Sequence, residues 1–189
     1  MHRVVKRMLI VAAALLVLSP SAARADGFVA PWFGGTFSQG PDFKSATSGR
    51  PTVGAALGTS GGGLFGFDID FGYTPGFFGE ESKSGKNNVV TITGNLIAGP
   101  SIESSGGKGV KPYATFGVGL IHSKVAANSD NNFGWDGGAG VMGFLSGSIG
   151  IRGDLRYFHT VNNTSATNTV LLKPGKFYFW RAYVGVIFR

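Results

Sequence analysis

Residues 64–74 read Leu-Phe-Gly-Phe-Asp-Ile-Asp-Phe-Gly-Tyr-Thr, and apolar side chains alternate along them with small or acidic ones. A period of two places successive side chains on opposite faces of a β-strand. The apolar face consists of Phe65, Phe67, Ile69, Phe71 and Tyr73, and the other face of Gly66, Asp68, Asp70, Gly72 and Thr74. The stretch therefore predicts a strand with one apolar face and one face of glycine and carboxylate.

The same alternation recurs along the chain and predicts eight strands. They are expected at residues 28–38, 52–59, 64–74, 89–99, 113–122, 133–145, 149–158 and 178–188. The inward face of the first strand is left open by its pattern. Most of these strands have about 9–12 residues, which exceeds the ~5–6 of an average globular strand and matches the ~9–11 that cross a bilayer.

The composition restricts the class of protein further. The chain has 189 residues with 32 glycines, 16 phenylalanines, no cysteine and 14% charged residues, whereas soluble domains have ~7% glycine and ~25% charge. The absence of cysteine excludes disulfide scaffolds, thiolate zinc sites and cysteine nucleophiles. Since 43% of the residues are hydrophobic, a disordered glycine-rich linker is excluded as well.

The first 25 residues have the layout of a secretory signal peptide. A basic start at residues 1–7 precedes an apolar run at residues 8–18, and Ala23-Arg24-Ala25 forms an A-x-A cleavage site. As a helix the apolar run spans only ~16 Å, about half the bilayer core, which argues against a membrane anchor. We expect cleavage after Ala25, which leaves residues 26–189 as one barrel domain.

Removal of this segment changes the charge balance of the chain. It takes away four basic residues and no acidic residue, so the net charge falls from +7 to +3. The remaining sequence has no run rich in lysine and arginine, and a nucleic-acid partner is therefore not expected.

The expected connections alternate in length. Long polar ones fall at 39–50, 79–88, 126–132 and 160–176, short ones fall at 60–63 and 146–148, and the connection near 100–109 is longer than the pattern requires. An even number of strands, with short turns at one rim and long loops at the other, is typical of an outer-membrane barrel. The predicted fold is all-β: an eight-stranded antiparallel transmembrane up-and-down β-barrel.

In such a barrel the apolar side chains face lipid and the polar ones fill the lumen. Aromatic residues bracket the strands, as interfacial girdles do: Tyr73, Tyr113, Trp135, Tyr157, Tyr178 and Trp180. The inner faces combine glycine with opposite charges, which we interpret as a lumenal ion-pair network. Its expected members are Asp68, Asp70, Asp136, Arg152, Asp154, Arg156 and Arg181. Such a network would plug the barrel, and its rearrangement could gate a narrow pore.

Four stretches carry a family resemblance: Phe-Gly-Val-Gly-Leu-Ile-His at 116–122, Gly-Ala-Gly-Val-Met-Gly-Phe at 138–144, Gly-Ile-Arg-Gly-Asp-Leu-Arg-Tyr-Phe at 150–158, and Phe-Trp-Arg-Ala-Tyr-Val-Gly-Val-Ile-Phe-Arg at 179–189. They resemble the small outer-membrane β-barrel proteins of Gram-negative bacteria, the OmpA/OmpX-like, porin-like group with an outer membrane protein β-barrel domain. The resemblance implies a location in the cell outer membrane after export through the periplasm. It also implies outer-membrane lipid, the barrel-assembly machinery and periplasmic chaperones as partners, and a monomeric barrel.

Members of this group usually end in an aromatic residue that the barrel-assembly machinery reads. The resemblance assigns this signal to the alternating residues Tyr178, Trp180, Val184, Val186 and Phe188. The present chain departs from the pattern because Arg189 follows Phe188.

Candidate residues for chemistry are few. His122-Ser123 and His159-Thr160 lie at the loop ends of expected strands, where lipid A-modifying barrels use a His/Ser pair, but adjacent residues face opposite sides of a strand. Asp68 and Asp70 lie ~7 Å apart on one face and no histidine accompanies them, which disfavours a metal site. The glycine-rich residues 58–63 lack the Lys-Ser/Thr pair and helix of a phosphate loop. We expect no catalytic residue, no cofactor and no metal ligand.

Three functions stay open. The first is a structural or narrow-pore barrel with interacting loops. The second is a surface adhesin or ligand-binding barrel that acts through loops 39–50 and 160–176. The third is a lipid A-modifying enzyme.

Overall fold

The computed structural model describes residues 27–38, 49–60, 63–78, 86–126, 128–161 and 178–189. Its strands are β1 (Gly27–Ser38), β2 (Arg50–Thr59), β3 (Phe65–Pro75), β4 (Asn87–Ala98), β5 (Ile102–Ser104), β6 (Lys108–Val125), β7 (Asn128–Phe144), β8 (Ile149–Thr160) and β9 (Tyr178–Phe188). A single 3-10 turn, η1 (Ser105–Gly107), is the one helical element in these ranges. No helix of the described residues could span a membrane. The expected signal peptide at 1–25 lies outside them.

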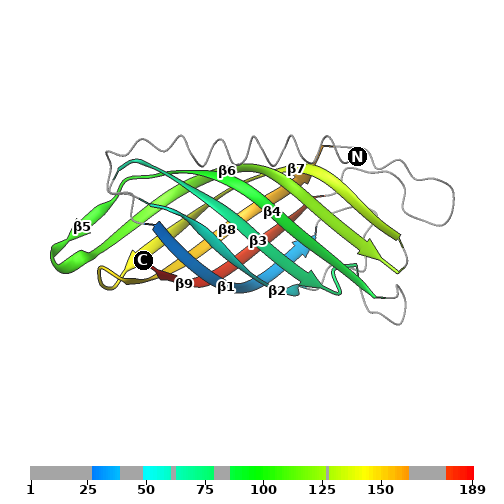
Figure 1. The fold of residues 1–189 in the computed structure, drawn as a ribbon, viewed down its shortest axis with the longest axis horizontal. Coiled ribbons are helices and arrows are strands. Elements are labelled where there is room, and N and C mark those ends of the chain that lie inside the picture. The colour runs from blue at the N-terminus through cyan, green and yellow to red at the C-terminus, as the bar shows by residue number, and fades with distance from the viewer. Residues whose placement is uncertain (1–26, 39–48, 61–62, 79–85, 127, 162–177) are drawn as a thin grey trace.

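Eight of the strands form a closed antiparallel barrel (Figure 1). Each long strand pairs with its neighbour in the sequence, β1 pairs with β9, and β4 pairs with β6. Closure leaves no unpaired sheet edge among these eight strands, which is what a β-structure needs in order to cross a bilayer. The predicted eight-stranded up-and-down barrel is therefore confirmed.

The strands are strongly staggered around the barrel. The path of paired residues from Phe65 in β3 runs through Ala98, Ala114, Ala139, Leu155, Ala182, Gly35 and Pro51. If the β2–β3 register is continued, this path returns to β3 at Pro75, ten residues beyond its start. With ~3.3 Å per residue and ~4.7 Å between strands, this stagger corresponds to a strand tilt of about 41°.

The alternation of faces holds on every long strand. On β3 the acidic and glycine positions are turned inward, while Phe65 and Phe67 are exposed on the outside. The face of β1, which the sequence left open, is now assigned: Phe28, Trp32 and Thr36 are buried in the lumen. The outside of the barrel is thus a continuous apolar surface, as the inverted arrangement of a membrane barrel requires.

The connection expected at 126–132 is not a long loop. β6 and β7 stay paired up to Val125 and Asn128, and Ala126 in the tight turn between them has a φ of 53°. The prediction was wrong because the residues of this segment are polar, and polarity was taken as a sign of a loop. A strand that continues beyond the apolar belt enters water, where its side chains can be polar on both faces.

The long connection near 100–109 contains a small extra hairpin. β5 pairs with the start of β6, from Ile102 opposite Val110 to Ser104 opposite Lys108. Gly106 and Gly107 turn the chain between them with φ values of 79° and 72°, a left-handed conformation that favours glycine. This hairpin extends the short-turn rim of the barrel, which is the rim that carries both β5 and the β7–β8 turn (Figure 1).

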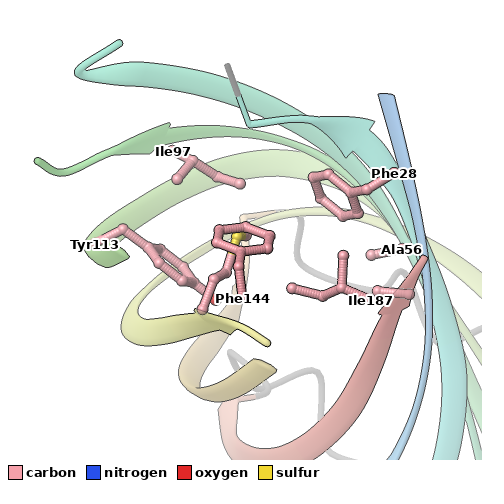
Figure 2. Close-up of a cluster of buried hydrophobic side chains, with 8 residues drawn as sticks. Phe28, Ala56, Ile97, Tyr113, Phe144 and Ile187 are labelled. Atoms are coloured by element: carbon pink, nitrogen blue, oxygen red, sulfur yellow. The ribbon is translucent and has the colours of Figure 1, made fainter. Parts of the chain in front are cut away.

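Two apolar clusters fill the two ends of the lumen. The cluster at the short-turn rim draws side chains from six strands, which point toward one another in Figure 2. It consists of Phe28, Ala30, Ala56, Ile97, Tyr113, Met142, Phe144 and Ile187. The cluster toward the long-loop rim consists of Phe77, Val89, Ile121, Phe158 and Phe179, with Phe78 packed against it. The buried aspartates and arginines at the middle of the strands, such as Asp68 and Arg156, lie between these two clusters.

Substitution of a glycine on the inner face can test how tightly neighbouring strands pack around the lumen. A Cβ added at Gly119 would lie 2.7 Å from the Cα of Thr93, whereas a Cβ at Gly153, on the lipid-facing side, would meet nothing within 4 Å. We predict that Gly119→Ala lowers the free energy of unfolding by about 1–3 kcal/mol because the two strands must separate. Urea unfolding of the refolded barrel in detergent micelles measures it.

Gly153→Ala is the matched control for this substitution. It shares the effect of alanine on the unfolded chain and introduces no overlap in the barrel. We expect its unfolding free energy to equal or exceed that of the parent protein. Equal stabilities of the two variants would contradict a packing role for Gly119.

Candidate functional site

The most concentrated set of polar groups in the described structure is a cluster of charged side chains at mid-height in the lumen. The structure brings together all seven residues that the sequence proposed for it. Asp68 and Asp70 come from β3, Asp136 from β7, Arg152, Asp154 and Arg156 from β8, and Arg181 from β9. All seven are buried. We refer to these residues as the charge cluster.

Arg156 is the centre of the charge cluster. Its Nε donates to Asp154 Oδ1 at 3.0 Å, and its Nη1 lies 3.4 Å from Asp136 Oδ1. Its Nη2 lies 3.5 Å from Asp68 Oδ2. One guanidinium group therefore holds carboxylates from three strands, a geometry that its planar fork of donors suits.

Arg152 extends the charge cluster toward the short-turn rim. Its Nη1 lies 2.7 Å from Asp68 Oδ2, and its Nη2 lies 3.1 Å from Asp154 Oδ2. Its Nε donates to the hydroxyl of Tyr113 at 2.7 Å, and that hydroxyl donates to Asp154 Oδ2 at 2.6 Å. Arg152, Tyr113 and Asp154 thus form a closed ring of hydrogen bonds, and Asp68 pairs with Arg152 outside this ring.

Tyr113 corrects one expectation. The sequence analysis placed it in an interfacial aromatic girdle, but its side chain points into the lumen and is only 4% exposed. The signal for this position was present in the sequence, since Tyr113 shares parity with Thr115 and Gly117 on the inner face of β6.

Arg181 forms a second group of contacts in the lumen, separate from the ion pairs of Arg152 and Arg156. It forms an ion pair with Asp70, and its Nη1 donates to Thr91 Oγ1 at 3.0 Å. Its guanidinium stacks 4.5 Å from the ring centroid of Trp32, whose Nε1 donates to Asp70 Oδ2 at 3.1 Å. The sequence analysis did not find Trp32 or Thr91, because neither residue type is charged.

Glycines make room for these side chains. A Cβ at Gly72 would lie 2.7 Å from Thr91 Oγ1, and a Cβ at Gly117 would lie 2.9 Å from Asp136 Oδ2. Long charged residues from neighbouring strands therefore occupy the volume that other side chains would fill. The glycine excess of the sequence is in part a requirement of the charge cluster.

The charge cluster lies in a dry part of the lumen. In all six of its ion pairs the side chains are at most 1% exposed, so that they have almost no contact with solvent. The apolar clusters around Phe144 and Phe158 lie on either side. Along the barrel axis the filling is thus apolar, then ionic, then apolar.

On the outside, aromatic side chains gather near the long-loop rim of β7, β8 and β9. Trp135, Tyr157 and Trp180 lie with neighbouring ring centroids 5.2–5.7 Å apart, and Tyr178 lies 6.0 Å from Tyr157. These four residues were predicted as girdle residues. The fifth, Tyr73, is exposed on the outer face of β3.

The two candidate histidines have partners other than the hydroxyl of the serine or threonine that follows each of them. His159 packs 5.6 Å from the Trp135 ring centroid, and its Nδ1 lies 3.5 Å from the Tyr157 hydroxyl, whereas Thr160 is buried in the lumen. His122 Nδ1 lies 2.7 Å from Asn131 Oδ1. These contacts supply no positive sign of catalysis. In the described ranges, no group of three histidine or acidic side chains could hold a metal ion.

The residues assigned to the assembly signal lie on the outer face of β9. Val184, Val186 and Phe188 are exposed to the lipid side, whereas Arg189 turns across the short-turn rim. Its backbone N–H donates to the Ser148 carbonyl at 3.0 Å, and its guanidinium lies 3.5 Å from the Phe144 ring centroid. The extra residue thus leaves Phe188 facing outward.

Comparison with solved structures shows the same fold in a neisserial surface protein and finds less similar structures in two further bacterial proteins. Neisserial surface protein A has a TM-score of 0.64 at 12% identity, with 86% of this chain and 96% of that chain covered. The N-terminal β-barrel domain of Pseudomonas aeruginosa OprF has a TM-score of 0.49 at 12% identity, with 87% and 97% covered. Ail of Yersinia pestis has a TM-score of 0.46 at 15% identity, with 87% and 99% covered.

Comparison with curated protein sequences gives no match. The family of the outer membrane protein beta-barrel domain, in contrast, matches residues 10–188. This range includes all eight strands of the closed barrel. By sequence and by fold, the chain belongs to the outer membrane protein beta-barrel domain family.

Proposed function

We propose that this protein is a non-conducting barrel of the outer membrane that serves as an anchored scaffold and acts through its outer surface. The observation that carries the proposal is the dry charge cluster, in which Arg156 bridges three carboxylates across the lumen. A pore requires a continuous path for water and ions, and the burial of all six ion pairs supports a closed lumen at this level.

Opening such a layer would be costly. An ion that passes would have to separate buried guanidinium and carboxylate groups, and breaking a buried pair costs about 3–5 kcal/mol. The apolar clusters above and below add two further barriers to water. A narrow gated pore is the second candidate, since a rearranged network could open it, but the packing favours the sealed form.

At the long-loop rim, the barrel wall extends outward along the ends of β4, β6 and β7. These three paired strands continue beyond the last pair of β7 with β8, Gly134 opposite Thr160. The outer residues of this extension are polar and exposed, among them Lys124 and Asn131. This surface suits interaction with polar partners outside the cell. Loops 39–50 and 160–176, proposed earlier as adhesive surfaces, lie almost wholly outside the described residues.

The same proposal includes the route to the membrane. We propose export through the periplasm with the signal peptide removed, assisted by periplasmic chaperones, and insertion as a monomer by the barrel-assembly machinery into outer-membrane lipid. The outward alternation of Tyr178, Trp180 and Phe188 supports the insertion step. No catalytic activity is part of this function.

Conductance tests the sealed lumen. We predict that the purified barrel, inserted in planar lipid bilayers, gives no stepwise channel openings, because the charge cluster blocks water and ions. A conducting porin inserted under the same conditions is the control for the assay. Reproducible openings that change in size with Arg156→Met would contradict the proposal and favour the narrow pore.

Stability tests the role of Arg156. Replacing it by methionine leaves three carboxylates short of a partner, so that we predict a loss of about 3–5 kcal/mol in the free energy of unfolding. Urea unfolding in detergent micelles measures this loss. Lys124→Met removes an exposed positive charge and should change stability by less than about 0.5 kcal/mol. Similar losses in both variants would contradict a central role for Arg156.

The N-terminus of the exported protein tests the route. We predict that protein purified from the outer-membrane fraction begins at Asp26, because Ala23-Arg24-Ala25 presents small residues to the signal peptidase. Intact-mass spectrometry distinguishes this form from the full chain. Recovery of the full-length mass, or of the protein in the soluble periplasm, would contradict this part of the proposal.

A further inference from the structure

The charge cluster contains more acids than bases. Four carboxylates meet three guanidinium groups within it. The inner-face cation nearest the short-turn rim, Lys111, donates to the Gly63 carbonyl, and Arg50 lies at the opposite end of the barrel, at the start of β2. An uncompensated charge in a dry interior is costly unless it is paired or neutralised. One of the four carboxylates therefore requires a further positive charge.

Two acceptor oxygens beside Gly117, from Asn95 and Asp136, mark the place of the surplus negative charge. Asn95 on β4, Gly117 on β6 and Asp136 on β7 are partners in register, and the missing side chain of Gly117 lets the outer two approach. A Cβ at Gly117 would lie 2.9 Å from Asp136 Oδ2 and even closer to Asn95 Oδ1. Both residues are fully buried, and neither oxygen accepts a hydrogen bond from a charged group. The neutral hydroxyl of Thr93 also donates to the Asp136 carboxylate.

A different orientation of the Asn95 amide would not remove the shortage of donors between Asn95 and Asp136. Its Nδ2 donates to Asp68 Oδ1 at 2.7 Å. If the amide were reversed, its oxygen would face Asp68 instead of Asp136, and the same shortage of donors would appear there. A single amide group cannot donate to two carboxylates on opposite sides, since both of its hydrogens are on one nitrogen.

We propose that Asp136 binds a proton on Oδ2 in the folded barrel and donates it toward Asn95 Oδ1. Its other oxygen, Oδ1, continues to accept from Arg156. The proton neutralises the surplus charge and supplies the missing donor at one position. The cluster then contains three carboxylates and three guanidinium groups.

The surroundings of Asp136 are consistent with this assignment. The charged groups that act on it are Asp70 from β3, Arg156 from β8 and Arg181 from β9, and the neutral Thr93 hydroxyl from β4 donates to it. Asp68 and Asp154 share Arg156 with it. The neighbouring positions on β4 and β6 are uncharged, namely Thr93, Asn95 and Gly117. Asp68, Asp70 and Asp154 each have an ion pair at 3.1 Å or less, whereas the pair of Asp136 is longer, at 3.4 Å. Asp136 is therefore the least compensated of the four carboxylates.

This inference goes beyond the proposed function, because a sealed lumen does not require a bound proton. It has a consequence for stability. An aspartate of the unfolded chain is ionised above about pH 4, so that unfolding in mildly acidic solution, above about pH 4, releases the proton. The unfolding equilibrium constant should then rise by about tenfold per pH unit from this group alone, for as long as the folded barrel retains the proton.

Infrared spectroscopy of the folded wild-type barrel tests the proton directly. A protonated carboxylic acid has a C=O stretching band that carboxylates lack. We expect this band in the wild type at about pH 5, where an ordinary aspartate is ionised, with a small shift after exchange into heavy water, and its loss in Asp136→Asn. Absence of the band in the folded wild type, or its persistence in Asp136→Asn, would overturn the assignment.

Stability measurements give a second and independent test. Asparagine has the shape of the neutral acid and can donate to Asn95 while accepting from Arg156. Asp136→Asn should therefore fold, and the ratio of the wild-type to the variant unfolding constant should rise by about tenfold per pH unit. Asp154→Asn is the matched control, because it leaves Arg152 and Arg156 short of a partner and should unfold more readily at every pH.

Two results would contradict the proton. The first is a loss of stability in Asp136→Asn as large as that in Asp154→Asn, which would show that the negative charge of Asp136 is needed. The second is a wild-type stability that depends on whether sodium, potassium or choline is the salt cation, which would show that a metal ion supplies the missing charge.

Discussion

The pairing of buried charges in a lumen too narrow for water is the constraint around which the interior of this barrel is arranged. Guanidinium groups on β8 and β9 reach carboxylates on β3 and β7. The inner glycines vacate the volume that these long side chains occupy, and the apolar clusters at both ends keep water away. Tyr113 and Trp32 complete hydrogen bonds that ion pairs alone leave open.

Much of the fold could be predicted from the sequence because a membrane barrel repeats one simple pattern. The period of two gave the eight strands and the inner and outer faces of seven of them. The members of the charge cluster followed from parity alone: a charged residue such as Asp68 or Arg152, within a strand that is otherwise apolar at every second position, can only face the lumen. The high glycine content and low charge content further distinguish the chain from ordinary soluble domains.

The remaining features depend on contacts between strands that are distant in the sequence. Arg181 meets Asp70 across 111 residues, and no local pattern states which arginine meets which aspartate. Tyr113 was misplaced because its residue type was given more weight than its parity. The polar strand ends beyond residue 125 were taken for a loop because a strand in water no longer shows an apolar face. In each case the position of the residue in the folded barrel determines its contacts, and the residue type alone does not.

The stagger of ten residues per circuit has a consequence for how this chain can change over time. Every strand is locked in frame with both of its neighbours, and a side chain shifted by one position exchanges lipid for lumen. Insertion of a single residue within β8 would turn Arg152 and Arg156 toward lipid and bring Ile151 and Leu155 into the charge cluster. Insertions and deletions are therefore restricted to the rims. There, loops and hairpins can change length while the strand register of the barrel stays the same.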